Sequence, residues 1–153
     1  MPRVSDINLI SHRETPALAV RTTTSVGELP RLIGETFQQI AEYLGEVGVL
    51  PAGTPYVCYF NQDMEHLDVE IGFPVGSRLA GQKSLQDSVI PQGKLVTVIH
   101  RGPYQTLSET YAEVGEWISA QGLTPVGPVY ESYLNGPEFP PEELLTQIGF
   151  PVR

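Results

Sequence analysis

The chain has 153 residues, with 18 acidic against 9 basic residues and a formal net charge of -9. This length is sufficient for one compact core, and a hydrophobic fraction of 41% without any low-complexity tract is typical of a folded protein. The acidic charge provides no electrostatic footprint for nucleic acid or for an anionic membrane, so we expect neither as a direct partner.

The cysteine and histidine residues indicate whether disulfides or a metal site are to be expected. Cys58 is the single cysteine and cannot form an internal disulfide, and the sequence shows no signal peptide or long apolar span. These features predict a cytoplasmic protein. The three histidines, His12, His66 and His100, lack the spacing of metal ligands, so we predict no metal and no cofactor.

The first half predicts a strand, a helix and two further strands. Val and Thr recur over Ala17–Thr24, which favours a strand. An apolar stripe follows at intervals of four, three and four residues, typical of one helix face: Ile33, Phe37, Ile40 and Leu44. Gly48 suits the end of this helix. Aromatic and β-branched residues then favour strands over Tyr56–Asn61 and over Ile71–Val75, where the sequence reads IGFPV.

The second half repeats this plan. Its Gly-x-x-Pro-x-Gly segment begins at Gly122, 74 positions after the one that begins at Gly48 (122 minus 48). The same shift superposes a second helical stripe on the first: Leu107, Tyr111, Val114 and Ile118. A strand is predicted before it over Lys94–His100 and another after it over Tyr130–Asn135. IGFPV recurs at Ile148–Val152, now 77 positions on (148 minus 71), so the last connection is three residues longer.

These elements predict an α+β fold made of a duplicated β-α-β-β module with pseudo-twofold symmetry. We expect a curved antiparallel sheet with both helices on one face, and a ligand groove between the modules on the other face. The chain is then a single domain of residues 1–153, with repeats over about 1–76 and about 93–153. The polar segment Ser77–Gln92 is predicted to connect them.

One position separates the two halves chemically. Glu131 falls opposite Val57 under the 74-residue shift, so a carboxylate replaces an aliphatic residue in the middle of a strand. Strand alternation puts Glu131 and Tyr133 on one face. A desolvated carboxylate needs a cationic or hydrogen-bonding partner, and a bound cation would be one. The alternative is that Glu131 is solvated or pairs with an internal Arg or Lys.

Aromatic residues are frequent in the segments that the repeat superposes. Aromatic faces attract cations, by roughly 0.5 to 2 kcal/mol depending on desolvation, and offer flat apolar contact. A carboxylate among such rings suits a lipophilic cation. Other rings are structural under the simpler interpretation; Phe37 and Tyr111 lie on the helix stripes and are assigned to the core.

The sequence resembles the GyrI-like small-molecule-binding domain family, which also supplies the effector-binding domain of multidrug-sensing transcription activators. The resemblance covers nearly the whole chain and rests on YVCYFN and VEIGFPV in the first half. In the second half it rests on RGPYQTLSETYAEVGEWI and GPVYESYLNGPEFPPEELLTQIGFPV. It implies a ligand-contacting role for Glu131, in the Tyr-Glu-x-Tyr segment, and a groove that binds aromatic or cationic molecules. The ring residues that we assign to that groove are Tyr59, Tyr104, Trp117 and Tyr133.

Three functions follow from the resemblance. The first is binding of small aromatic or cationic hydrophobic molecules, of the drug or toxin class, with no chemistry. The second is hydrolysis of strained cyclopropane-type genotoxins, with Glu131 as general base and Tyr133 or Tyr104 as proton donor. The third is a gyrase-inhibitor-like interaction through the acidic surface. Because the first module begins close to Met1, we expect a stand-alone form without a DNA reader, whose possible protein partners are a separate regulator or gyrase.

Overall fold

The computed structural model describes residues 3–153. These residues form eight β-strands, two α-helices and two short 3-10 helices, and every strand pairing within the units described below is antiparallel. The chain divides into two compact units. The middle unit is Arg13–Gln92; the terminal unit combines the described residues up to His12 with Gly93–Arg153.

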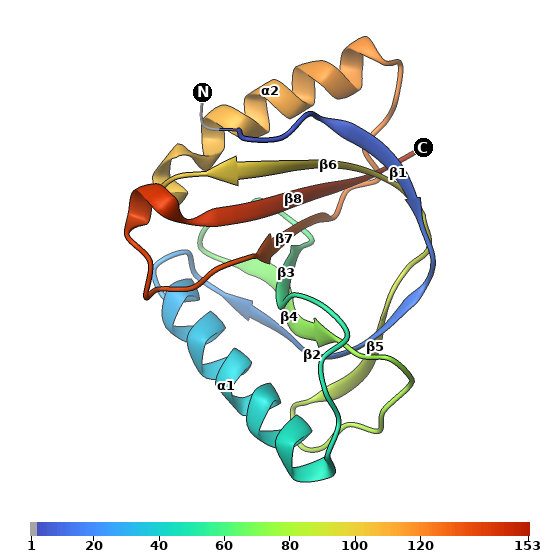
Figure 1. Ribbon diagram of the computed structural model, residues 1–153, viewed down its shortest axis with the longest axis vertical. Helices are drawn as coiled ribbons and strands as arrows, with labels where there is room; N and C mark the ends of the chain where they lie inside the picture. Colours follow the sequence, from blue (N-terminus) through green and yellow to red (C-terminus); the bar gives the residue numbers. More distant parts are fainter. Residues whose placement is uncertain (1–2) are drawn as a thin grey trace. The chain divides into compact units, whose positions relative to one another are not determined.

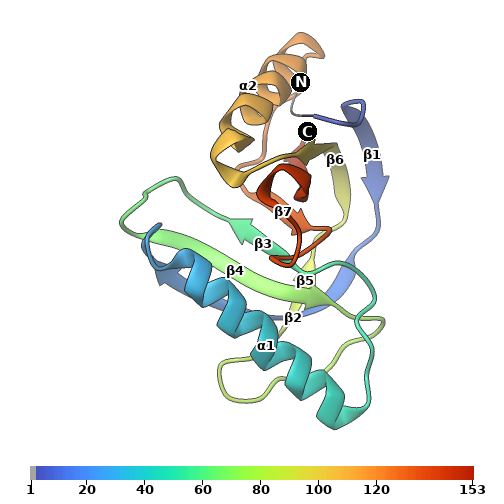
Figure 2. The same cartoon turned by 60° about the vertical axis from the view of Figure 1, so that its left-hand side comes forward.

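The middle unit has four strands and one helix, in the strand order β3-β4-β2-β5. Its elements are β2 (Thr15–Thr24), α1 (Leu29–Val47), β3 (Tyr56–Tyr59), β4 (Leu67–Pro74) and β5 (Gln86–Ile90). Figure 2 shows α1 lying along β4 and β2, with which it makes its strand contacts. The core between helix and sheet contains Leu18, Val20, Ile40, Leu44, Val75 and Leu85.

The terminal unit also has four strands and one α-helix, together with two 3-10 helices, in the strand order β1-β6-β8-β7. They are β1 (Asn8–His12), β6 (Gly93–Arg101), η1 (Tyr104–Thr106), α2 (Leu107–Ala120), β7 (Val129–Tyr133), η2 (Pro141–Glu143) and β8 (Leu145–Val152). In Figure 1 the helix α2, drawn in orange, runs beside β6. The core of this unit contains Val96, Val98, Leu107, Val114, Ile118, Ile148 and Val152.

Both helices end where the sequence predicts. Gly48 follows α1 with φ 72°, a left-handed conformation that glycine adopts without steric cost, and its N–H reaches the last turn of the helix. Gly122 has the same φ of 72° just after α2, and its N–H bonds to the carbonyl of Ser119. The two Gly-x-x-Pro-x-Gly segments therefore terminate helices in both units.

The strand registers agree with the two shifts read from the sequence. Val57 on β3 lies opposite Ile71 on β4, and Glu131 on β7 lies opposite Ile148 on β8. Glu131 thus takes the sheet position of Val57. The α+β class with antiparallel sheet is confirmed.

Two strands were missed by the sequence argument. The segment Ser77–Gln92, predicted to be only a connection, contains β5, which pairs with β2, and Leu85 next to it is buried in the core. The N-terminal residues form β1, which pairs with β6 rather than with its neighbour in sequence. Neither strand has a buried residue, and the two apolar residues of each are adjacent, so both lack the apolar alternation that identifies a half-buried strand.

Candidate functional site

Glu131 lies in the middle of β7 and its side chain is buried, with 7% of the residue exposed. In the sheet it stands in one row with Ile148 on β8 and Val98 on β6, and residues opposite one another on antiparallel strands share a face. Both apolar neighbours pack in the core against α2. Glu131 therefore lies on the helix-covered face. The sequence predicts the ligand groove on the face away from the helices, and therefore the opposite face for a ligand-contacting Glu131; this prediction is wrong.

Two phenols hold the carboxylate. Tyr133, two residues further along β7, donates a hydrogen bond to Glu131 Oε1 at 2.9 Å. Tyr111, from α2, donates a short hydrogen bond to Oε2. Donors of this kind replace part of the hydration that a carboxylate loses on burial. The pair of oxygens is consequently fixed in orientation by a strand residue and a helix residue.

Tyr104 connects this centre to the surface. It belongs to η1, and its ring meets the Tyr133 ring edge-on, with centroids 5.9 Å apart and an interplanar angle of 74°. Although the residue is 47% exposed, partial burial and the negative charge of Glu131 raise the pKa of the Tyr104 phenol. Tyr104 is thus within the electrostatic influence of the buried carboxylate.

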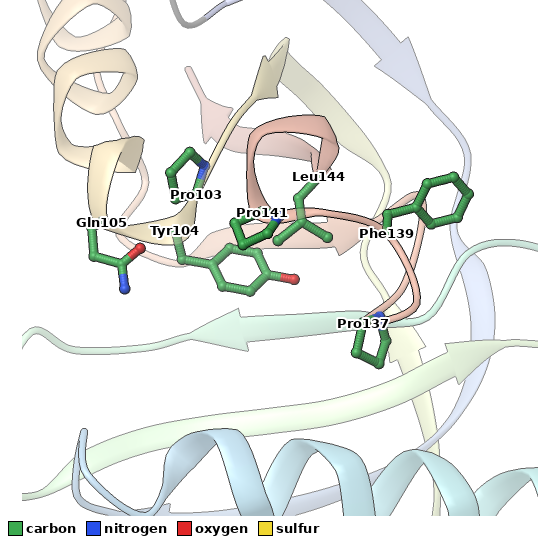
Figure 3. Close-up of a pocket in the computed structure, with 7 residues that line it drawn as sticks. All are labelled: Pro103, Tyr104, Gln105, Pro137, Phe139, Pro141 and Leu144. Carbon is green, nitrogen blue, oxygen red and sulfur yellow. The ribbon is translucent and has the colours of Figure 1, made fainter.

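A hollow of about 350 Å³ opens beside Tyr104. Its walls are mostly apolar: Pro103, Tyr104, Gln105, Pro137, Phe139, Pro141 and Leu144. Figure 3 shows the Tyr104 ring lying along Pro141 and Leu144, with its hydroxyl directed toward the side where Phe139 and Pro137 lie. The longer second connection, between β7 and β8, supplies four of these residues: Pro137, Phe139, Pro141 and Leu144.

The other predicted ring residues are placed differently. Trp117 lies on α2 and is partly buried against the apolar core of the terminal unit. It is at the helix position six residues after Tyr111, and its described contacts are those of a core residue. Tyr59 ends β3 in the middle unit, opposite Val69. The terminal unit therefore brings together Glu131, Tyr133 and Tyr104, but Tyr59 belongs to a different unit.

Sequence reasoning missed the role of Tyr111. Its place on the apolar stripe assigned it to the core, and its ring does meet Phe150 edge-on at 5.6 Å. Its hydroxyl, however, reaches Glu131. The signal that could have found it is the shift of 74: Tyr111 aligns with Phe37, so the second half carries a hydroxyl where the first half has none, just as it carries a carboxylate opposite Val57.

The middle unit has a carboxylate of its own, at Glu70 on β4. It accepts hydrogen bonds from Tyr56 at 2.8 Å and from Ser88 at 3.0 Å. Its neighbour Ile71 pairs with Val20, which packs against α1, so Glu70 points to the face away from the helix. It is partly buried. Glu70 and Glu131 therefore share their partner chemistry but lie on opposite faces of their sheets.

Within residues 3–153, no three or more His, Cys, Asp or Glu side chains are grouped so that they could hold a metal ion. Neither α1 nor α2 combines the length and apolar character that a helix needs to cross a membrane. The candidate site is thus a carboxylate with phenols and an adjoining apolar hollow.

The sequence profile of the GyrI-like small molecule binding domain matches residues 6–153. The chain belongs to this family. A search of curated proteins finds no match to it. The family resemblance that the Tyr-Glu-x-Tyr segment and the two IGFPV copies indicate is therefore confirmed, and the family is one of small-molecule-binding domains.

Solved structures share the fold of this GyrI-like domain. EcmrR in a complex with DNA has a TM-score of 0.83 and 24% identity, and the match covers 97% of this chain but 57% of the EcmrR chain. The separate EcmrR C-terminal domain has a TM-score of 0.80 at 24% identity, with 97% of each chain covered. The GyrI-like domain thus spans little more than half of the EcmrR chain in the DNA complex.

Two further structures have lower identities. A hydrolase from Listeria innocua has a TM-score of 0.76 and 16% identity, over 99% of this chain and 93% of its own. SAV2435, in a structure bound to tetraphenylphosphonium, has a TM-score of 0.65 and 15% identity, over 97% of this chain and 94% of its own. At these identities the likeness establishes the fold.

Proposed function

We propose that this GyrI-like domain binds small aromatic or cationic hydrophobic molecules beside Glu131. The carboxylate is the counter-charge, and the rings of Tyr133 and Tyr104 are the aromatic contacts. The observation that carries the proposal is that Glu131 is buried while both its oxygens accept hydrogen bonds from phenols.

The physical argument rests on the cost of burying a charge. Two phenol donors offset part of that cost at Glu131. A lipophilic cation would add a favourable contact between opposite charges, and it loses little hydration when it moves from water to an aromatic site. Its apolar surface would contribute the rest of the affinity through burial against rings. A neutral aromatic molecule gains only this second contribution, so cations are the preferred class.

Comparison with solved structures supports the same class of ligand. SAV2435, which shares the fold, was solved with tetraphenylphosphonium, a cation surrounded by four aromatic rings. Tetraphenylphosphonium is therefore the first probe to test on this chain.

The experiment is a calorimetric titration of the protein, and of its Glu131→Gln variant, with tetraphenylphosphonium. We expect saturable binding to the protein, and a loss of about 2 kcal/mol, roughly 30-fold in Kd, in the variant, because Gln keeps the shape but not the charge. Glu70→Gln is the matched control, since Glu70 is also a phenol-bonded carboxylate, and its Kd should stay within about twofold, or 0.4 kcal/mol. Equal affinity of the protein and Glu131→Gln, or no binding to either, would refute the proposal.

Hydrolysis is the second candidate, favoured by the fold shared with the Listeria innocua hydrolase. It uses the same carboxylate as a general base toward water, with a Tyr133 or Tyr104 hydroxyl as proton donor. Incubation with a cyclopropane-containing electrophile, followed by mass spectrometry, separates the candidates. Addition of water to the compound that depends on Glu131 would favour hydrolysis, whereas unchanged recovery of a bound compound would favour binding alone.

A further inference from the structure

His100 is a fully buried histidine that the candidate site does not use directly. It lies near the end of β6, with 0% of the residue exposed, and both ring nitrogens have threonine partners. Nδ1 lies 2.7 Å from the Thr110 hydroxyl on α2, and Nε2 lies 3.1 Å from the Thr106 hydroxyl at the end of η1. One side chain thus joins a strand end to two successive turns of the helical segment.

The hydroxyl of Thr106 assigns the tautomer of the ring. It donates its single hydrogen to the carbonyl oxygen of Pro103, at 2.8 Å, so toward His100 it can act only as an acceptor. The hydrogen of a neutral ring is therefore on Nε2, and Nδ1 accepts a hydrogen bond from Thr110. The Nε2 hydrogen bond is consequently one of two consecutive hydrogen bonds, from the ring to the Thr106 hydroxyl and from that hydroxyl to the Pro103 carbonyl.

These hydrogen bonds close the short turn that contains Tyr104. The Pro103 carbonyl also accepts the backbone N–H of Thr106 at 3.0 Å, so the side-chain and backbone bonds clamp the same two residues around Tyr104. Gly102, just before the turn, has φ 133°, and an added Cβ would lie 3.3 Å from Thr106 Oγ1. A side chain at residue 102 would therefore be both strained and crowded.

We propose that His100 is a positioning residue of the ligand site: through Nε2 and the Thr106 hydroxyl it holds the 103–106 turn so that the Tyr104 ring stays edge-on against Tyr133. The second bond, from Thr110 to Nδ1, stabilises the packing of α2 on β6 but does not determine where Tyr104 lies. The site's aromatic wall is thereby fixed before a ligand arrives, which lowers the ordering cost of binding. This inference rests on the proposed function for its effect on affinity, but not for its effect on Tyr104.

Two isosteric variants separate these roles. Thr106→Val and Thr110→Val each remove one hydroxyl that bonds to the same buried ring, so both should unfold at lower urea concentration than the parent protein. Tyr104 is followed in protein labelled with ¹³C in the tyrosine rings, with Tyr104→Phe assigning its signal. In Thr106→Val we expect the Tyr104 signal to move and its pKa to fall toward that of an exposed tyrosine. In Thr110→Val both should match the parent, and Thr106→Ser should restore them.

Affinity for tetraphenylphosphonium is measured on the same samples. We expect Kd to rise about tenfold in Thr106→Val and by less than about twofold in Thr110→Val, as a change in preorganisation predicts. Thr106→Val also removes the hydrogen bond from Thr106 to Pro103, so His100→Gln and His100→Asn make the comparison at the ring itself. A Gln amide N–H can reach the Nε2 position, whereas Asn reaches only the Nδ1 position. His100→Gln should then keep the Tyr104 signal and His100→Asn should change it.

The outcomes distinguish this inference from the proposed function. An unchanged Tyr104 signal in Thr106→Val, or equal changes in both threonine variants, would show that His100 has only a structural role. A Tyr104 signal that changes in Thr106→Val and in His100→Asn, but not in Thr110→Val or His100→Gln, would support the positioning role even if the parent protein did not bind tetraphenylphosphonium, a result that would overturn the proposed function instead.

Discussion

Asn61 and Asn135 make the same pair of hydrogen bonds in the two units. Asn61 donates to the carbonyl of His66 at 3.0 Å and accepts from the N–H of Asp68 at 3.0 Å. Asn135 donates to the carbonyl of Glu143 at 2.9 Å and accepts from the N–H of Leu145 at 2.8 Å. Asn61 therefore holds together the base of the connection between β3 and β4, and Asn135 that of the longer connection between β7 and β8.

Replacing Asn135 by Ala should loosen the connection that forms much of the hollow. The Leu145 N–H is partly buried, so its loss of a partner should lower the free energy of unfolding by about 1–2 kcal/mol. Asn61→Ala is the control, and should have a smaller effect because water can reach the exposed Asp68 N–H. Urea unfolding of the two variants measures the difference. Equal losses of stability would show that burial of the amide is not what matters.

The two glycines of the IGFPV copies should tolerate a methyl group very differently. A Cβ at Gly72 would lie 2.8 Å from the Ala19 Cβ and 2.8 Å from the Leu18 carbonyl oxygen, atoms that move only with the backbone. At Gly149 the nearest atoms, 3.2 Å away, belong to the flexible Leu95 side chain.

We therefore expect Gly72→Ala to lower the free energy of unfolding by about 1–3 kcal/mol or more, as overpacking does, and Gly149→Ala to lower it by less than about 1 kcal/mol. Thermal and urea unfolding check the order of the two variants. A larger effect at Gly149 would contradict the packing described for Gly72.

Tyr104 should make stability fall at alkaline pH. Its pKa in the folded protein is raised above the usual value of 10.0 by burial and by Glu131, so the unfolded chain loses its proton first as pH increases. The contribution to stability is therefore fully present below pH 10.0 and is lost as pH rises through the folded-state pKa. Tyr104→Phe should show a weaker decline above pH 10.0. In Glu131→Gln, an NMR titration should show a lower Tyr104 pKa; an unchanged value would mean that Glu131 exerts no field there.

Replacing Thr146 by Val should stabilise the protein. Its hydroxyl is buried, the residue is 0% exposed, and the oxygen has no hydrogen-bond partner among the described residues. Removing an unsatisfied buried hydroxyl while keeping the β-branched shape should raise the free energy of unfolding by about 1 kcal/mol. Thr110→Val makes the same change where the hydroxyl bonds to His100, and should lower it by a similar amount. A destabilised Thr146→Val would indicate that this hydroxyl has a partner, such as an ordered water.

The sequence predicts the elements that have a strong apolar period. The apolar stripe that contains Ile40 and the one that contains Val114 are both buried faces of helices. The difference between the repeats, Val57 in the first and Glu131 in the second, identifies the residue that lies buried at the centre of the candidate site. Local signals, such as the glycine after each helix, likewise predict where the helices end.

What the sequence does not predict is which sheet face a helix covers, and which strand an exposed segment joins. For Glu131, strand alternation gives two faces without indicating which one meets α2. For β5, pairing through backbone groups leaves no pattern in side chains such as those of Asp87 and Ser88, so the segment resembles a connection. Both errors concern long-range pairing rather than local preference.

The placement of β1 and β5 has a consequence for the order in which the protein assembles. β1 is synthesised first, but its partner residues follow far along the chain, as the pairing of Asn8 with Thr97 shows. Conversely, β5 completes the middle unit just before the chain returns to the terminal one at Gly93. During synthesis the middle unit can therefore fold before β6, the partner of β1, is available. The terminal unit folds last, after its final strand has left the ribosome. Contacts so distant in sequence are slow to form, so refolding should be limited by the recruitment of β1.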